Sequence, residues 1–486
     1  MEDSPVQLSK EISYSISSME HPSYQFNKIN PLQQNSLASL ATPQEITWEV
    51  PAYCWNPAKS YISFVSSIAG AATNKVLHLN QPWMNALTLS TRSGLRLLDL
   101  NSNFEMFYNM QSSFNNLEEL ETSDISRQSS VNNQLRDNLA SQRYAANVGN
   151  NGTTTYASLN YVEQQYVELK TTNVAVPASV DGVFTKRIVI PLNKIRDTIL
   201  AEDKDYLFNE ILILRVQFGD VGILGSENTT AILNGVGGIN SANAPTALGI
   251  TSLSDITFWC AQEMNQSIVN SLAQKVSSAE GFEVLTPVSY IYKTTTGAAS
   301  SSSITQRITS YHGRYCKKII YSAYLAPSAA PTAIVALRLK YDRSNIVVAT
   351  NDSPNTSTLS TDVPKLIEFY DNLNNNRLSQ VNYRVLSNED YDHMRRYHAK
   401  NSVNPRGTVI ANRNIFYYNH HFVRDFTNDE ESKNTSKQSL ALGLDLTNEI
   451  RYDWYNVSQA SIALDHYMII SCSKLLKVSS QGVSFN

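Results

Sequence analysis

The stretch from Phe184 to Phe218, FTKRIVIPLNKIRDTILAEDKDYLFNEILILRVQF, is the part of this 486-residue chain that says most about its fold. It contains two apolar segments, Ile188–Leu192 and Ile211–Phe218, separated by charged residues. In the second segment one face carries Leu212, Leu214, Val216 and Phe218, and the other face carries Arg215 and Gln217. This period of two is typical of a strand with one buried face. The first segment is rich in β-branched residues, and Pro191 favours the end of a strand there. The stretch therefore predicts two strands of a β-sandwich.

Similar short patterns recur along the chain. Two helices are also predicted: Phe104–Met110, and a helix of about three turns with Ile268, Val269, Leu272 and Val276 on one face. A capping box of Ser387 and Asp390 predicts a third short helix, which Asn404-Pro405 ends. The predicted strands lie within Ile46–Val50, Tyr61–Val65 (after a turn at Asn56-Pro57), Asn85–Leu100 (with a turn at Ser93-Gly94), Ile256–Trp259, Phe282–Tyr292, Lys318–Leu325, Ala333–Tyr341, Leu440–Leu446 and Ile462–Val478.

The order of these elements predicts two large units. Residues 1–44 are polar with scattered prolines and are expected to form an N-terminal arm. Residues 45–262 and 263–486 are then two successive β-sandwiches, with 263–279 as a linker helix. Long polar stretches at 123–160 and 219–247 are expected as loop insertions. The predicted fold class is all-β, with short helices and long polar loops.

Composition restricts the class of protein. Hydrophobic residues make up 42% and charged residues 17%, which is enough apolar material for a core. The 39 basic and 43 acidic side chains give a formal charge of -4, and no basic run suited to phosphate binding is present. Without a charged-then-apolar leader or an apolar run of roughly 18 to 20 residues, a product of the cytosol or nucleus is expected.

Few residues suggest catalysis or metal binding. The four cysteines, which have no CxxC spacing, are expected to be buried and reduced, although disulfides or metal ligands remain alternatives. The Gly235–Gly238 run is expected to be a flexible loop, because no helix or Lys-Ser/Thr follows it. Asp465-His466 would need a Ser or Cys from elsewhere to form a triad. His393 with His398, and His420 with His421, lack a spacing that brings two ligands to one face. No catalytic, cofactor-binding or metal-binding residue is predicted.

Four segments follow one another in a recognisable order. Asn85–Met110 combines a small-Gly turn, an acidic residue and a short helix, and Ile190-Pro191-Leu192 is followed about twenty residues later by the strand Glu210–Val216. Arg307–Tyr324 is rich in hydroxyl and basic residues, and Gln438–Val483 contains apolar closing strands. In this order the segments resemble the double jelly-roll major capsid proteins of eukaryotic double-stranded DNA viruses, especially the Polinton-like virus and virophage branch.

This resemblance implies a function as well as a fold. It implies two consecutive jelly rolls per chain, and homotrimers of pseudo-hexagonal outline that tile an icosahedral shell. The chain would be a structural protein of the virion without enzymatic activity, made in the host cytoplasm or nucleus. Its expected partners are copies of itself, penton proteins and minor capsid proteins, with an inner membrane left open and no direct sequence-specific binding of nucleic acid. The arm 1–44 and the loop 219–247 are expected to reach adjacent subunits, and the acids between Asp197 and Asp205 to lie in a solvated or inter-subunit loop.

Two other classes of protein stay open at this stage. A viral spike or receptor- or glycan-binding β-sandwich is one alternative, for which fibrous repeats or a trimeric stalk would be expected. An enzyme on a β-sandwich scaffold, such as a glycosidase, is the other, and it requires paired carboxylates in a cleft.

Overall fold

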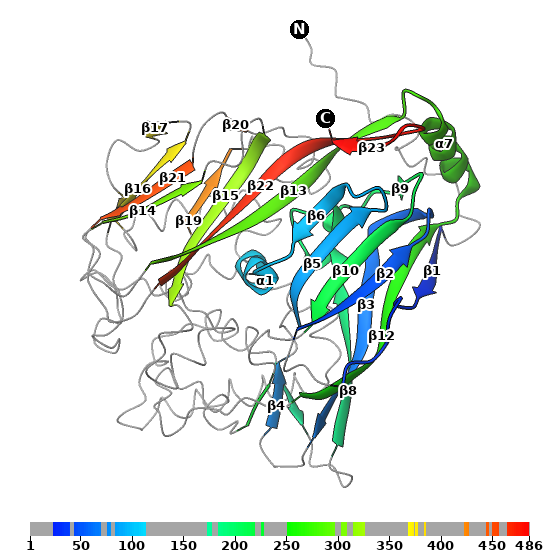
Figure 1. Cartoon of the computed structure of the whole chain (residues 1–486), viewed down its shortest axis with the longest axis horizontal. Helices are drawn as coiled ribbons and strands as arrows, with labels where there is room; N and C mark the ends of the chain where they lie inside the picture. The colour runs from blue at the N-terminus through cyan, green and yellow to red at the C-terminus, as the bar shows by residue number, and fades with distance from the viewer. Residues whose placement is uncertain are drawn as a thin grey trace, which may run out of the picture.

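The computed structural model is built mostly of antiparallel β-strands, as predicted (Figure 1). The residues it describes are 23–38, 43–69, 75–78, 83–112, 173–176, 183–218, 225–227, 250–296, 303–308, 314–325, 368–373, 375–377, 383–384, 422–426, 444–446, 450–455 and 464–485. Among the predicted features, the helix after Ser387, the strand Ala333–Tyr341, the loop 123–160 and the histidines at 393, 398, 420 and 421 lie outside these residues. Of the predicted loop 219–247 only residues 225–227 are described, and they form a short strand instead of a loop.

Eight strands of the first half form two facing sheets. One sheet has the order β1-β12-β3-β8 and the other β2-β10-β5-β6, and every pairing is antiparallel. If the eight strands are lettered B to I in chain order, the two sheets become B-I-D-G and C-H-E-F, which is the strand order of a jelly roll. The strands are β1 (Tyr24–Ile29), β2 (Gln44–Val50), β3 (Cys54–Ala69), β5 (Met84–Thr91), β6 (Arg96–Leu100), β8 (Val183–Pro191), β10 (Leu212–Phe218) and β12 (Ile250–Glu263).

The second half repeats this arrangement. Its sheets have the orders β13-β22-β15-β19 and β14-β21-β16-β17, so the same B-I-D-G and C-H-E-F pattern returns. These strands are β13 (Phe282–Thr296), β14 (Ser303–Ile308), β15 (Arg314–Leu325), β16 (Glu368–Leu373), β17 (Asn376–Arg377), β19 (Phe422–Asp425), β21 (Ile450–Tyr455) and β22 (Leu464–Ser479). The chain therefore contains two consecutive jelly rolls, which confirms the predicted fold class.

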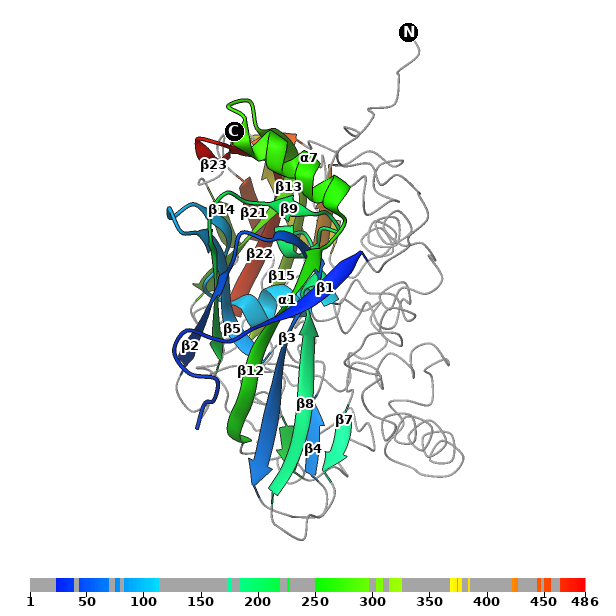
Figure 2. The ribbon, with the colours of Figure 1, turned by 90° about the vertical axis from the view of Figure 1, so that its right-hand side faces the viewer.

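Short elements complete the two sandwiches. In the first half, β4 (Lys75–His78), β7 (Asn173–Val176) and β11 (Gly225–Glu227) form a small sheet, and β9 (Tyr206–Leu207) pairs with β3. Figure 2 shows β12, β3 and β8 side by side, with β4 and β7 at the end away from α7 (Gln266–Ser277). In the second half, β18 (Tyr383–Arg384) pairs with β16, β20 (Leu444–Leu446) with β15, and β23 (Gly482–Phe485) with β22.

Two of the three predicted helices lie within the described residues, and both are present. The helix α1 (Phe104–Ser112) follows β6, and its Phe104, Met106 and Phe107 are buried. The helix α7 begins after Asn265, whose side chain accepts a hydrogen bond from the Ser267 amide, and it follows β12 directly. Leu272 and Val276 bury the apolar face of α7.

The strand that gave the clearest pattern lies in the middle of its sheet. In β10 the side chains of Leu212, Leu214, Val216 and Phe218 are all buried, while Arg215 is exposed, as the period of two predicted. The Phe218 ring meets Phe64 of the facing sheet edge to face, with 5.3 Å between ring centroids. Burying each such side chain stabilises the fold by roughly 1.5 to 3 kcal/mol, so β10 fixes how the two sheets pack.

Two details differ from the sequence expectations. Residues 24–29, placed in the arm, form β1 and pair with β12 along their whole length. The Asn56-Pro57 turn does not separate two strands, because both residues lie within β3; the register with β12 shifts there between the pairs Asn56–Ala261 and Tyr61–Trp259. The division of the chain into 1–44, 45–262 and 263–486 stays a prediction.

Candidate functional site

Charged side chains from the two jelly rolls meet in a cluster that is largely closed to solvent. The first jelly roll contributes Asp197, Glu202 and Lys204, and the second contributes Lys317 and Lys318. The side chains of Asp197 and Lys318 are each 17% exposed, and that of Glu202 is 9% exposed. The expectation of a solvated or inter-subunit loop is therefore wrong for these residues. We call this cluster the ionic junction.

Asp197 is the centre of the ionic junction. Its carboxylate accepts hydrogen bonds from Lys318 Nζ at 2.5 Å and from Gln111 Nε2 of α1 at 2.8 Å. Its backbone carbonyl accepts a bond from Ser289 Oγ of β13 at 2.7 Å. The backbone of Asp197 has φ 55°, in the left-handed region that Asp tolerates better than most residues. Asp197, a turn residue of the first jelly roll, thus bonds to two strands of the second jelly roll, β13 and β15, and to α1 of the first.

A β-bulge in β15 explains how two successive lysines reach the same junction. Cys316 pairs with Cys472 and Lys318 with Ser471, so Lys317 is the extra residue of the bulge. In a regular strand neighbouring side chains point to opposite faces, whereas a bulge re-aims one of them. Lys317 and Lys318 both interact electrostatically with Asp197 as a result.

The local charges set the protonation state of the junction acids. Burial alone would raise the pKa of Asp197, but the Lys318 ammonium and the hydrogen bonds from Lys318 and Gln111 hold that pKa below its usual value. Burial raises the pKa of Glu202, and its ion pair with Lys204 opposes that rise. Asp197 is therefore the firmly ionised acid of the junction.

Lys317 is held in an unfavourable environment for a cation. Burial lowers the pKa of Lys317 from 10.5 to about 8, even though Glu202 and Asp197 act in the opposite direction. The two pKa values correspond to about 3 kcal/mol against the charged form. Lys318 therefore stabilises the junction through its ion pair with Asp197. The charged form of the adjacent Lys317 is disfavoured by burial.

Further polar contacts connect β13 and β22 of the second jelly roll to the first jelly roll. Lys204 Nζ donates to the Leu285 carbonyl at 3.3 Å, and Asn209 Nδ2 donates to the Ser479 carbonyl at 2.6 Å. Strand β13 also lies beside β6 (Figure 1). The first bond goes to the edge strand β13 and the second to the end of β22, so polar contacts to both strands join the two jelly rolls.

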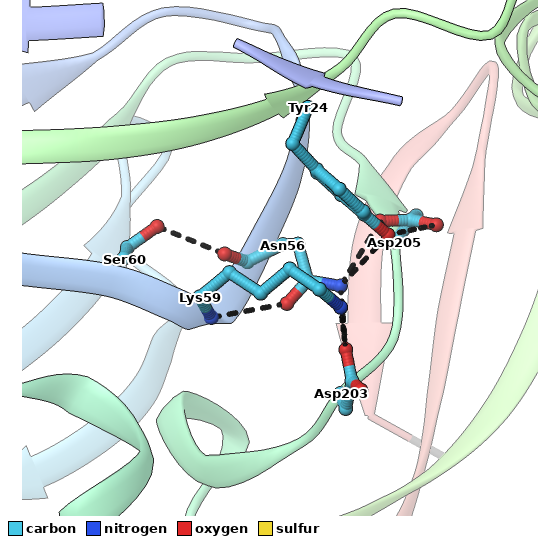
Figure 3. A network of polar contacts seen from close by, with 6 residues as sticks. All are labelled: Tyr24, Asn56, Lys59, Ser60, Asp203 and Asp205. Carbon is cyan, nitrogen blue, oxygen red and sulfur yellow. Dashed lines mark hydrogen bonds and ion pairs between the residues drawn. The ribbon is translucent and has the colours of Figure 1, made fainter. Parts of the chain in front are cut away.

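A second polar network ties β1 to the bulge of β3 (Figure 3). Asn56 Nδ2 donates to Asp203 Oδ1 at 3.0 Å and to Asp205 Oδ1 at 3.1 Å, and Tyr24 Oη donates to Asp205 Oδ1 at 3.1 Å. Lys59 pairs with Asp203 and lies over the Tyr24 ring, 4.5 Å from its centroid. The acids of this segment that are not in the ionic junction therefore anchor the first strand of the fold.

The Asp465-His466 pair does not form a hydrolytic triad. Successive residues of β22 point to opposite faces. The Asp465 carboxylate binds Lys293 Nζ at 2.9 Å and Thr295 Oγ1 at 2.6 Å, while His466 Nδ1 bonds to Tyr321 Oη at 2.5 Å. Burial lowers the pKa of His466 to about 3, so this imidazole is neutral near pH 7.

The remaining predictions of chemistry concern cysteines, metals and membranes. All four cysteines are buried and reduced, as expected from the sequence. Among the described residues, no group of three His, Cys, Asp or Glu side chains is placed to hold a metal ion. In the same residues, no helix is long and apolar enough to cross a bilayer.

The ionic junction holds elements of the two jelly rolls together. Asp197 bonds to Lys318 of β15 and Gln111 of α1, and Lys204 bonds to the Leu285 carbonyl of β13, which fixes these elements relative to one another. Sequence reasoning found the acids 197–205 but not their partners, because Lys317 and Lys318 lie more than a hundred residues away. The local signal was a pair of adjacent lysines followed by the apolar residues Ile319 and Ile320.

Comparisons with known proteins give similarity at the level of structure. No family model matches the sequence, and no curated protein is significantly similar to it. Solved structures do superimpose over nearly the whole chain. A chain of the Sputnik virophage structure covers 100% of this chain and 93% of its own length, at 8% identity and a TM-score of 0.48.

Two further solved structures give similar values. The Faustovirus major capsid protein covers 96% of this chain and 93% of its own length, at 10% identity and a TM-score of 0.48. The mavirus major capsid protein covers 99% of this chain and 93% of its own length, at 8% identity and a TM-score of 0.46. Because these TM-scores are below 0.5, the assignment of two consecutive jelly rolls depends on the strand orders described above.

Proposed function

We propose that the chain is a structural major capsid protein that forms the shell of a double-stranded DNA virus or related element. The observation that carries this proposal is the repetition of one strand order in two jelly rolls of a single chain. Three such chains supply six similar sandwiches, and a cyclic trimer of them has a nearly hexagonal outline. Such blocks tile an icosahedral shell, as the sequence resemblance implies.

The ionic junction supports this function because a capsid building block must keep the relative orientation of its two jelly rolls. A block that is pushed by its neighbours would lose its outline if the two jelly rolls turned against each other. Buried ion pairs and hydrogen bonds from Asp197 to α1, β13 and β15 oppose such a turn. A formal charge of only -4 also limits repulsion between copies packed side by side.

Purified protein examined by light scattering and negative-stain microscopy tests the proposal. Trimers of roughly hexagonal outline are expected. A stable monomer with a single compact lobe would contradict it. A glycan-array screen distinguishes a capsid protein from a spike or receptor-binding protein. Strong and specific glycan binding by a monomer would favour the spike or receptor-binding protein.

The proposal extends to partners and location. The chain would reside in the virion, contact other trimers, penton proteins and minor capsid proteins, and be made in the host cytoplasm or nucleus. Co-purification of the chain with particles that contain DNA, on a density gradient, is the expected result. Recovery of the chain only in fractions without particles would refute this location.

A further inference from the structure

We propose that Cys316 and Cys472 are a redox pair that can close into a cross-strand disulfide inside the second jelly roll. Cys316 lies in β15 and Cys472 in β22, and the two residues are direct register partners. Directly opposite residues in an antiparallel pair share a face, with Cα atoms about 4.5 or 5.5 Å apart according to the type of pair. Disulfides span Cα separations of about 4.4 to 6.8 Å, so either type is within reach.

The surroundings place both sulfurs in a dry core. Cys316 and Cys472 are each 0% exposed. Their neighbours across the sheet are Leu444 of β20 and Val288 of β13, which extend the same row on either side. The row contains no His, Cys, Asp or Glu besides these two cysteines, so pairing of the two thiols is the chemistry that the geometry favours.

The bulge after Cys316 gives the backbone room to adjust. A regular ladder constrains both partners of a cross-strand pair, whereas the ladder is interrupted here between Cys316 and Lys318. The Cys316 thiol makes a weak bond to the Lys318 carbonyl at 3.6 Å, which a disulfide would replace. Formation of the disulfide therefore breaks only this weak hydrogen bond among the contacts described for the Cys316 thiol.

The other two cysteines provide an internal control. Cys54 is the register partner of Leu207, and Cys260 is the register partner of Asn27, so neither faces a cysteine across a strand pair. Cys54 and Cys260 are as deeply buried as Cys316 and Cys472, so the register of the strands is what distinguishes the proposed pair from the controls.

The oxidation is balanced with a peroxide as the oxidant. One thiolate attacks a peroxide oxygen and becomes a sulfenic acid, as the O–O bond breaks and hydroxide leaves. The second sulfur then attacks the sulfenic sulfur, so that an S–S bond forms, the S–O bond breaks and water leaves. Two thiols lose two electrons and two protons in total, and hydrogen peroxide is reduced to two waters.

The pair would form a covalent link between β15 and β22 in oxidising surroundings and would open in reducing surroundings. Thiols persist in a reducing cytosol, and disulfides persist outside the cell. If the proposed shell function holds, the link would be open during synthesis and closed in released particles. It would join β15 and β22, the two central strands of their sheet, around the long chain segment between them.

The test uses the purified full chain and hydrogen peroxide, at urea concentrations from zero to just below the unfolding midpoint so that the buried pair opens transiently. Thiols are counted after denaturation, and unreduced peptides are identified by mass spectrometry. We expect loss of two of the four thiols, a linked Cys316–Cys472 peptide, and a rise of roughly 5 to 15 °C in the unfolding midpoint that dithiothreitol reverses.

Two variants complete the test. Cys316→Ala should abolish both the linked peptide and the rise in midpoint, whereas Cys260→Ala should keep both. The proposal is overturned if the linked peptide is missing at every urea concentration. Sulfinic or sulfonic acids in place of the link, a Cys54–Cys260 link, or links between chains would overturn it equally. None of these outcomes depends on trimer formation, so the result is independent of the proposed function.

Discussion

Replacing Lys318 with Met tests whether the ionic junction holds the two jelly rolls together. The substitution keeps most of the side-chain volume but removes the ammonium that lies 2.5 Å from Asp197 Oδ2. Asp197 then keeps the hydrogen bond from the Gln111 amide and its weaker electrostatic interaction with Lys317, in a site where its side chain is 17% exposed. Loss of one partner from a buried ion pair costs about 3 to 5 kcal/mol, and the residual exposure places the expected loss at about 2 to 4 kcal/mol.

The neighbouring lysine is a matched control. Lys317→Met removes the same charge from the same bulge, but it also removes a cation that burial disfavours. We therefore expect no loss of stability, or a gain of up to about 2 kcal/mol. Both variants are compared with the wild type by urea unfolding, with the midpoint and the slope fitted separately. A difference in midpoint without a change in slope reports stability.

A double-mutant cycle isolates the pair itself. Asp197→Asn combined with Lys318→Met should cost clearly less than the sum of the two single substitutions, with a coupling of about 1 to 3 kcal/mol. If Lys317→Met costs as much as Lys318→Met, or if the cycle gives no coupling, the account of the junction is wrong.

Three further outcomes are expected. The free energy of unfolding of the wild type should rise relative to that of Lys317→Met between pH 8 and 10.5, because the unfolded state binds a proton that the folded state has lost; parallel pH curves would contradict the low pKa of Lys317. At the acid end, the stabilisation from Asp197 is present above its unfolded pKa and is lost as pH falls through its lowered folded pKa, so Asp197→Asn should flatten the curve below about pH 4. Gly281→Ala should destabilise the fold by more than about 2 kcal/mol, because Gly281 has φ +68° and a Cβ there would lie 2.2 Å from the Val478 carbonyl oxygen; near-neutral unfolding data would refute this.

Periodicity in the sequence predicted the strands that have one buried face. Buried and more exposed side chains alternate along β10, and β2, β13, β15 and β22 lie where apolar or β-branched segments predicted them. The strand β1 was missed because its six residues, YQFNKI, are mostly exposed or half-buried and carry no apolar alternation. What holds β1 is its ladder to β12 and the bond from Tyr24 to Asp205, 181 positions away. No local pattern reports contacts of that range.

The same limit applies to the ionic junction. Its acids were visible in the sequence, yet their role depends on a one-residue bulge in β15 that aims Lys317 and Lys318 at one face. A bulge changes which face a side chain meets without changing the apolar pattern that predicts the strand.

The position of β1 also sharpens the expectation about the N-terminal arm. Deleting residues 1–40 would remove β1 together with its ladder to β12, so damage to assembly could not be separated from damage to the first jelly roll. Deleting residues 1–22 leaves β1 in place. If the arm reaches adjacent subunits, the shorter deletion should weaken shell formation while the unfolding midpoint stays within about 2 °C of the wild type, because the described core keeps all its strands. The longer deletion should lower that midpoint as well. Unchanged assembly of the shorter variant, measured by sedimentation and microscopy, would show that the arm is not an assembly element and would leave the jelly rolls themselves as the source of contacts between copies.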